Sequence, residues 1–330
     1  MAASTISAPA RLFLAVLILI VGACSPAATA TAPTATELTP TAAATAAPTP
    51  TAVPAFPVTL TDDEGTEVTI PAEPQRIVSL TPDTTETLFA IGAGSRVVAK
   101  VEDIANFPPE AASLPIVATF AGVDVERIVD LEADLVISAG AGLTQGAAVE
   151  QLRRAGIPVL VSYPTTIDEG LASIRRTGLA VGLGDEAAIL ADDMDARIDD
   201  LAVLASTATT RPRVFYEIDV TGGIFTPPAD SIYGEMFRLA GGEPISGDAN
   251  YSISLEELVD ADPEVILLGD GAYGVTPEQV ADRPGWDGMT AVKNGRIVVV
   301  DDVVVTRPGP RLVDGLRALV AAIHPELTLP

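Results

Sequence analysis

The sequence predicts an α/β protein in which a helical segment connects two similar halves. Three observations support this prediction. Short apolar runs alternate with helical patterns along most of the chain, as in parallel sheets with helices on both faces. Residues 166–206, in the middle of the chain, have almost no strand pattern. A segment of the first half aligns without gaps with a segment of the second, and 330 residues are enough for about two domains.

The chain begins with the pattern of a signal peptide, residues 1–23. Arg11 precedes the apolar run 12–23, which is too short to span a membrane comfortably. The run ends in VGAC, where small residues directly precede Cys24, the only cysteine of the chain. This ending resembles a lipobox, the processing site of bacterial lipoproteins. We therefore predict that Cys24 is lipidated and anchors the protein to a membrane; an ordinary secretory signal is the alternative.

Residues 24–56 follow the signal and consist, after Cys24, almost entirely of alanine, threonine and proline. Such a segment has too few large apolar side chains to offset the entropy lost on ordering. We expect a tether between the lipid anchor and a folded body. The protein is then extracytoplasmic, on the periplasmic or cell-surface face of the membrane.

Residues 57–164 are predicted to form an N-terminal lobe. They open with a hairpin pattern, VTLTDDEGTEVTI, whose turn contains Gly65. Apolar strand patterns then alternate with helical ones, among them a helix over 146–155. The expected strands are Arg76–Leu80, Val97–Val101, Asp134–Ser138 and Pro158–Ser162.

Residues 165–209 are predicted to be a helical connector. Gly182 and Gly184 divide it into two helices. The second, Asp185–Ala205, has apolar residues at the spacing of one long helix, about 30 Å at the usual rise per residue. A helix of that length can act as a strut between two α/β lobes.

Residues 210–330 are predicted to form a C-terminal lobe of the same kind as the first. Expected helices cover 233–240 and 311–322. The expected strands are Val214–Asp219, Glu264–Leu268 and Arg296–Val300.

The internal repeat pairs VERIVDLEADLVISAG (125–140) with LEELVDADPEVILLGD (255–270) at an offset of 130. In both copies a short helix leads directly into a buried strand. Asp124 and Ser254 precede the two helices as capping residues. Glu126 aligns with Glu256, and the first helical turn keeps both carboxylates exposed and favoured by the helix dipole. Coincidence within a common helix–strand pattern is the alternative.

Composition removes several classes of function. A net charge of −26 argues against nucleic-acid binding, because phosphates would be repelled. With one cysteine and one histidine, His324, a Cys/His zinc site or a Ser-His-Asp triad is hard to assemble. No GxGxxG follows the first strand and GxxxxGK[ST] is absent from the sequence. We expect no catalytic residues, no resident metal and no cofactor, although counting does not exclude a carboxylate-dependent hydrolase.

Three stretches in order carry a family resemblance: PQRIVSLTPDTTETLFAIGAG, VERIVDLEADLVIS and NGRIVVVDDVVVTRPGPRLVDGL. They resemble the iron-complex and vitamin B12 solute-binding proteins of ABC importers, of the lipoprotein type, over residues 57–326. The resemblance implies two Rossmann-like lobes with mostly parallel sheets. One long rigid helix joins them, and the ligand is held in the cleft between them. It implies a monomer that carries a metal chelate, such as cobalamin, a ferric siderophore or haem, as cargo.

The resemblance also implies a docking mechanism. One glutamate on each lobe contacts arginines of the two permease subunits. The matching residues are Glu126 and Glu256, the pair that the internal repeat aligns. Glu86 and Glu257 are neighbouring alternatives. A sensory or surface-binding module of the same fold, without transport, is the competing interpretation.

Several residues are expected to line the ligand cleft. Thr81, Pro82 and Asp83 form a turn beyond the carboxyl end of the first main strand, where open α/β sheets place their ligand crevice. Thr81–Pro82 fits a helix start with free N–H groups, and Asp83 with Glu86 fits a competing capping box. The resemblance adds Phe120 and Phe225, where corrinoid binders have aromatics. Candidates for meeting a ferric siderophore are Arg307, Tyr216, Tyr233, Tyr251 and Tyr273.

Overall fold

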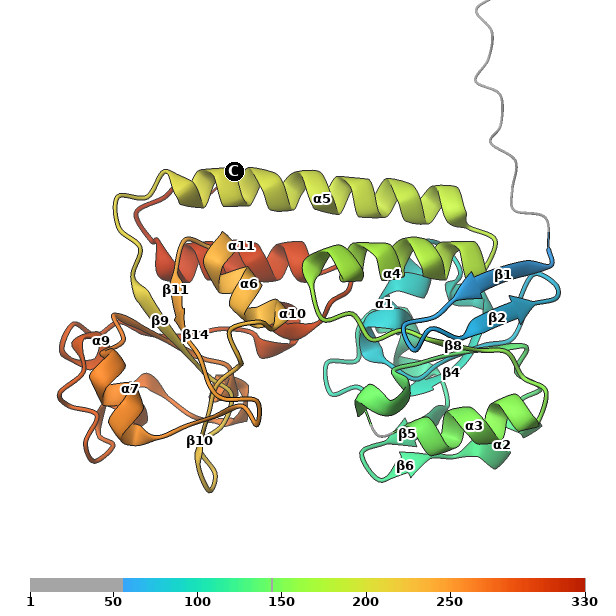
Figure 1. Ribbon diagram of the computed structural model, residues 1–330, viewed down its shortest axis with the longest axis horizontal. Helices are drawn as coiled ribbons and strands as arrows, with labels where there is room; N and C mark the ends of the chain where they lie inside the picture. The colour runs from blue at the N-terminus through green and yellow to red at the C-terminus, as the bar shows by residue number, and fades with distance from the viewer. Residues whose placement is uncertain (1–55, 144, 330) are drawn as a thin grey trace, which may run out of the picture. The chain divides into compact units, whose positions relative to one another are not determined.

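A computed structural model describes residues 56–143 and 145–329 (Figure 1). The signal peptide, Cys24 and nearly all of the tether lie outside the described residues. The lipid anchor and the tether therefore stay predictions.

The N-terminal lobe is a six-stranded sheet preceded by an antiparallel hairpin. All neighbouring strands of the sheet are parallel except β5 and β6, an antiparallel pair at one edge. The hairpin strands are β1 (Val58–Thr61) and β2 (Glu67–Ile70). The sheet order is β6 (Gly122–Val123), β5 (Ile116–Thr119), β4 (Val97–Val101), β3 (Ile77–Ser79), β7 (Leu135–Ser138) and β8 (Val159–Val161).

Side chains that alternate along β3 enter two different cores, so both faces of this sheet are buried. Ile77 belongs to the core shared with α1 (Pro82–Ala90), whereas Val78 belongs to the core shared with α2 (Val125–Asp130) and α3 (Gly146–Arg154). Burial on both faces explains why the strands of this sheet appear in the sequence as continuous apolar runs.

The C-terminal lobe contains a four-stranded parallel sheet. Its order is β11 (Glu243–Ile245), β9 (Arg213–Glu217), β13 (Val265–Leu268) and β14 (Ile297–Val299). A small antiparallel pair, β10 (Ile224–Phe225) and β12 (Ser252–Ile253), lies beside it. The helices of this lobe are α6 (Ile232–Leu239), α7 (Leu255–Ala261), α8 (Pro277–Ala281), α9 (Thr290–Lys293), α10 (Asp302–Thr306) and α11 (Leu312–Ile323).

Two antiparallel helices, α4 (Ile167–Ala180) and α5 (Gly184–Ser206), connect the lobes. The long helix α5 runs above both lobes and packs on α4 at one end and on α11 at the other (Figure 1). Its buried face, from Ala187 to Ala205, belongs to one core that continues into both lobes. The predicted fold class is therefore confirmed, and the expected helix bounds differ from those of α5 by one residue at each end.

The internal repeat is also present in the structure. Helices α2 and α7 are followed by left-handed residues at equivalent positions, Glu132 (φ 51°) and Asp262 (φ 45°). Strands β7 and β13 then occupy positions that differ by the same offset of 130. Asp124 accepts from the N–H of Arg127 and Ser254 from that of Glu257, so both expected helix caps are confirmed.

Candidate functional site

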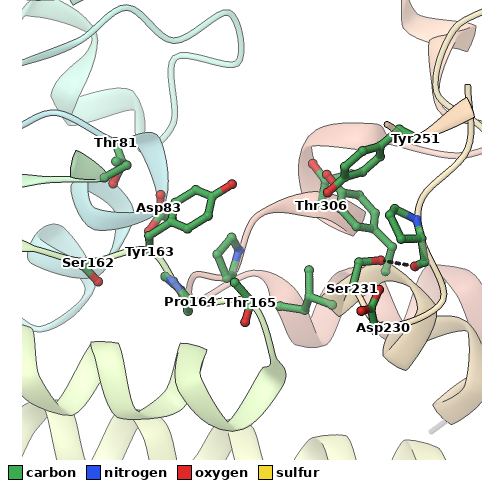
Figure 2. A pocket seen from close by; sticks show the side chains of 15 residues that line it. Thr81, Asp83, Ser162, Tyr163, Pro164, Thr165, Asp230, Ser231, Tyr251 and Thr306 are labelled. Atoms are coloured by element: carbon green, nitrogen blue, oxygen red, sulfur yellow. Dashed lines mark hydrogen bonds between the residues drawn. The ribbon is translucent and has the colours of Figure 1, made fainter. Parts of the chain in front are cut away.

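A cavity of about 550 Å³ lies between the lobes (Figure 2). Its N-terminal wall comes from the turn after β3 and from the segment that follows β8. Its C-terminal wall comes from the start of α6, from Tyr251 and from the end of α10. The volume is within the usual range of small-molecule sites, and segments after parallel strands are where open α/β sheets bind ligands.

Hydroxyl groups and apolar surfaces make up most of the lining. Three tyrosines contribute, with Tyr163 on one wall and Tyr233 and Tyr251 on the other. The aliphatic hydroxyls belong to Thr81, Ser162, Thr165, Ser231 and Thr306. The apolar residues are Ala139, Pro164, Pro228, Ile232 and Pro308. Two carboxyl groups, those of Asp83 and Asp230, complete the described lining.

Capping interactions position the turn at the start of α1. The Thr81 hydroxyl oxygen accepts from the N–H of Thr84 at 3.4 Å, and Pro82 is the first helical residue. This start was predicted from the sequence. Asp83 follows at the cavity wall, where burial raises its pKa to about 6 although a hydrogen bond with Thr81 acts to lower it.

The wall opposite is built in the same manner. Ser231 caps α6 by accepting from the N–H of Gly234, and its hydroxyl donates to the carbonyl of Pro228 at 2.6 Å. Burial raises the pKa of Tyr251, and the neighbouring Tyr163 and Asp230 raise it further. Burial also raises the pKa of Tyr233. Both phenols are therefore neutral at physiological pH and can donate hydrogen bonds.

Tyr163 projects from the N-terminal lobe towards Tyr251 and Thr306 on the other lobe (Figure 2). Its backbone N–H donates to Asp63 Oδ2 at 2.7 Å, which ties the segment after β8 to the β1–β2 hairpin. The Tyr163 side chain itself remains 43% exposed. Aromatic rings thus face the cavity from both lobes.

An ion-pair cluster joins the lobes beside the cavity. Arg307 Nη1 lies 3.1 Å from both Glu86 Oε1 and Asp103 Oδ2. Arg311 Nη2 lies 2.6 Å from Glu86 Oε1, and its guanidinium stacks on the ring of Phe107. Burial acts to raise the pKa of Asp103, but the hydrogen bonds and charge of Arg307 lower it below its usual value.

This cluster corrects two expectations for Glu86. The proposed capping box of Asp83 with Glu86 is wrong, because Thr81 caps the helix and both Glu86 oxygens bind arginines. Glu86 is also wrong as an alternative docking residue, because it is only 2% exposed.

The structure brings some of the predicted cleft residues together and leaves others apart. Thr81 and Asp83 line the cavity, whereas Pro82 does not. Phe120 is fully exposed in the turn between β5 and β6, and Phe225 is half-buried in β10. Arg307 points into the ion-pair cluster. Their ligand-binding roles stay predictions.

Of the four tyrosines suggested for siderophore contact, Tyr233 and Tyr251 line the cavity. Tyr216 is fully buried and donates to Asp302, and Tyr273 is 70% exposed outside the cavity. Sequence reasoning missed Tyr163, although it directly follows a predicted strand. The rule that selected the turn after β3 selects this position as well.

Glu126 and Glu256 are exposed in the first turns of α2 and α7, on different lobes. Glu257 instead accepts from the backbone N–H of Ser254 at 2.9 Å in a capping box. The geometry therefore leaves Glu256 freer than Glu257 to meet a partner. Docking itself stays a prediction.

Comparison with known sequences identifies the family of this fold. The sequence model of the periplasmic binding protein family matches residues 77–304. The chain belongs to this family. Among relatives of this periplasmic binding protein is the ABC transporter substrate-binding lipoprotein YvrC of Bacillus subtilis, 33% identical over 82% of this chain and 87% of its own. A cobalamin-binding protein of Halobacterium salinarum is 30% identical over 82% of this chain and 74% of its own.

Solved structures agree with the assignment. The vitamin B12-binding protein BtuF of Vibrio cholerae matches this periplasmic binding protein with a TM-score of 0.66 and 26% identity, over 76% of this chain and 97% of its own. The haem-binding protein RhuT of Roseiflexus matches with a TM-score of 0.67 and 28% identity, over 76% and 98%.

Residues 56–143 and 145–329 contain neither a metal-binding cluster nor a membrane-spanning helix. No cluster of three or more His, Cys, Asp or Glu residues there is arranged to hold a metal ion. No helix in that part of the chain combines the length and apolarity needed to cross a bilayer.

Proposed function

We propose that this protein is the extracytoplasmic receptor of an ABC importer, which captures a metal chelate between its lobes and delivers it to the permease. The observation that carries the proposal is the cavity whose walls come from both lobes. Membership of the periplasmic binding protein family and a relative named as an ABC transporter substrate-binding lipoprotein support it.

The proposed ligand is a corrinoid or a ferric siderophore, with the corrinoid first. The relatives named for a ligand include a cobalamin-binding protein at 30% identity and vitamin B12-binding proteins at 29%. Tyrosine and proline side chains give the cavity flat apolar surfaces, and hydroxyls on both walls suit the amide groups of a corrinoid. The protein would bind and release this cargo without chemical change.

Binding is tested by mixing the purified chain with cyanocobalamin, haem and a panel of ferric siderophores. Native mass spectrometry reports stoichiometry, and absorbance reports the chelate. We expect one chelate to bind in a one-to-one complex. Absence of binding to every member of the panel would overturn the proposal, and turnover of a bound ligand would favour the hydrolase alternative.

Delivery to the permease is proposed to use Glu126 and Glu256. These carboxylates lie at equivalent positions on the two lobes, where two permease subunits can each meet one of them. Charged rim contacts of this kind mainly set the association rate and the orientation of docking. Replacing both by arginine is expected to abolish uptake into cells and leave chelate affinity unchanged.

The matched control is the double substitution Asp195→Arg with Asp199→Arg on the exposed side of α5, which changes the net charge equally. It is expected to retain uptake. If the Glu126 and Glu256 variant transports normally, the docking proposal fails. If neither the wild type nor the Glu126 and Glu256 variant supports uptake while both bind the chelate, the sensory alternative is favoured.

The anchor proposal rests on Cys24 and the apolar run before it. Cys24→Ser is expected to move the protein from the membrane fraction to the soluble extracytoplasmic fraction. A variant that remains in the membrane fraction would contradict lipidation at this residue.

A further inference from the structure

We propose that the cavity selects its cargo by charge, accepting neutral and cationic chelates and rejecting polyanionic ones. The inference rests on the proposed function, because it assumes that this cavity binds a chelate. It concerns the class of chelate within that function, and it is carried by the charges on the cavity walls.

Two aspartate carboxyl groups are the only acidic or basic side chains, apart from the neutral tyrosines, among the described lining residues. Asp83 lies on the N-terminal wall and Asp230 on the C-terminal wall, and no described lining residue is a lysine, arginine or histidine (Figure 2). Neither aspartate forms an ion pair with a described cation. A bound chelate is therefore placed between two carboxylates without an ion-pair partner in the wall. The charge of Arg307 acts to lower the pKa of Asp83, but Arg307 itself is paired with Glu86 and Asp103.

Asp83 has a raised pKa of about 6, so most molecules carry its charge at pH 7. The phenols of Tyr233 and Tyr251 stay neutral, because burial raises the pKa of both. The tyrosines therefore offer hydrogen bonds but no compensating charge.

The arginines nearest to the cavity are already bound by other carboxylates. Arg307 and Arg311 share Glu86, and Arg307 also binds Asp103. If Arg307 turned towards an anionic ligand, it would leave the buried Asp103 carboxylate unpaired, which is strongly unfavourable. These cations are therefore not available to an anionic ligand.

Arg176 is a further cation near this wall, because it contacts Ser162 of the cavity lining. Its Nη2 lies 2.6 Å from Asp63 Oδ1 and 3.5 Å from the hydroxyl of Ser162. Two hydrogen bonds from Thr165 lower the pKa of the Glu169 carboxyl, and the positive charge of Arg176 lowers it further. The charge of Arg176 is thus matched by at least one carboxylate.

A second hollow adjoins the cavity and is acidic as well. It shares Ala139, Tyr163 and Thr165 with the cavity and adds the carboxylates of Glu64 and Glu169, together with that of Asp63, which is paired with Arg176. Clefts lined by one sign of charge concentrate ligands of the opposite sign and repel those of the same sign. The adjoining hollow and the cavity therefore disfavour the same class of ligand.

The test uses the full-length chain and two pairs of chelates of different charge, the first of which differs in little else. One pair is cyanocobalamin and its monocarboxylate, in which one propionamide is replaced by a propionate. The other is the cationic ferric trihydroxamate ferrioxamine B and a trianionic ferric tricatecholate. Isothermal titration calorimetry at low and at physiological salt gives each Kd. We expect the anionic member of a pair to bind at least about tenfold more weakly, with a smaller ratio at higher salt.

The variants Asp83→Asn and Asp230→Asn remove one wall charge each with little change in shape. Each variant is expected to reduce the ratio of the Kd of the anionic chelate to the Kd of the other member of its pair. The double variant is expected to bring this ratio close to one. Asp199→Asn on α5 makes the same charge change outside the cavity and is expected to leave the ratio unchanged. Asp230 is exposed, so its variant folds even if Asp83→Asn does not.

Two results separate this inference from the function on which it rests. Equal affinity of the wild type for both members of a pair, or a ratio that both variants leave unchanged, overturns charge selection and keeps the receptor function. Failure of all four chelates to bind overturns the receptor function and charge selection with it. If only one pair of chelates binds, the ratio of the two Kd values within that pair tests charge selection.

Discussion

Arg307 and Asp103 form a two-point ion pair between the lobes, with Nη2 2.5 Å from Oδ1 and Nη1 3.1 Å from Oδ2. Thr306, the residue before Arg307, lines the cavity. Paired hydrogen bonds of this kind fix orientation as well as distance. The same guanidinium binds Glu86, so one side chain connects the segment before α11 to α1 and to the loop after β4. The cavity wall is thus anchored to the opposite lobe.

We expect Arg307→Ala to lower the free energy of unfolding by about 2–4 kcal/mol, because it leaves Asp103, whose side chain is 3% exposed, without its cation. Arg311 still binds Glu86, which limits the loss. Urea unfolding followed by circular dichroism measures the change. The control is Arg175→Ala, whose exposed pair with Asp192 is worth less than about 1 kcal/mol. A similar small change in both variants would show that the interlobe pair does not stabilise the fold.

The pair of carboxylates Asp270 and Glu217 makes stability depend on pH. Asp270 is 4% exposed and its oxygens accept no hydrogen bond from a described donor, whereas Glu217 binds Arg283. Burial, together with the negative charge of Glu217, raises the pKa of Asp270 to about 7. The folded state therefore holds this proton more tightly than the unfolded state. The contribution of Asp270 to stability is largest below its unfolded pKa and is lost as pH rises through about 7.

Asp270→Asn removes this titration. Relative to the wild type, the variant is expected to gain about 2–3 kcal/mol between pH 5 and pH 8. Urea unfolding of both proteins at each pH gives this difference, in which the titration of other groups cancels. A stability difference that is the same at both pH values would mean that Asp270 is already ionised in the folded state at pH 5.

Local patterns predicted the elements of this fold better than they predicted the site. Apolar runs and helical spacing depend on neighbours in the chain, so α5 and the expected strands could be placed closely, although short strands such as β5 and β11 were not predicted. Glu86 and Arg307 are 221 residues apart, and no local pattern indicates that they pair. Glu86 resembled a capping residue because its spacing from Asp83 suits that role. Its real partners depend on how the lobes pack.

The cavity shows the same limit. Thr81 and Asp83 were predicted from the end of a strand, a rule that depends on one lobe alone. Their position opposite Tyr251 and Asp230 depends on the connector, whose length sets the register of the lobes. The sequence indicated Thr81 and Asp83 on one wall and named Tyr233 and Tyr251 of the other wall among its siderophore candidates, but it did not indicate that the two pairs face each other.

Tyr163→Ala is expected to weaken chelate binding by about tenfold or more, because it removes the aromatic surface of the N-terminal wall. The side chain is 43% exposed, so the free energy of unfolding should change by less than about 0.5 kcal/mol. Calorimetric titration and urea unfolding measure the two effects separately. Tyr273→Ala, at a 70% exposed tyrosine outside the cavity, is the control and should bind normally. Normal binding by the Tyr163 variant would place the ligand elsewhere.

Gly178 permits the close packing of α4 on α5. A Cβ added at Gly178 would overlap the Cβ of Ala187 and lie 2.6 Å from the carbonyl oxygen of Leu183. Gly170 lies in the same helix, but a Cβ there would meet its nearest described neighbour, Pro308 O, at an ordinary 3.6 Å. Glycine inside a helix normally costs about 0.5–1 kcal/mol relative to alanine, so the two substitutions should differ in sign.

Gly178→Ala is expected to lower the free energy of unfolding by about 1–3 kcal/mol through overpacking, whereas Gly170→Ala should raise it slightly. Urea unfolding of both variants measures the contrast, and because both substitutions have the same intrinsic effect on helix stability, their difference reports packing alone. If both variants are more stable than the wild type, the crossing of α4 and α5 can widen without penalty. The packing of α4 on α5 would then be too flexible to hold the two walls of the cavity in a fixed register.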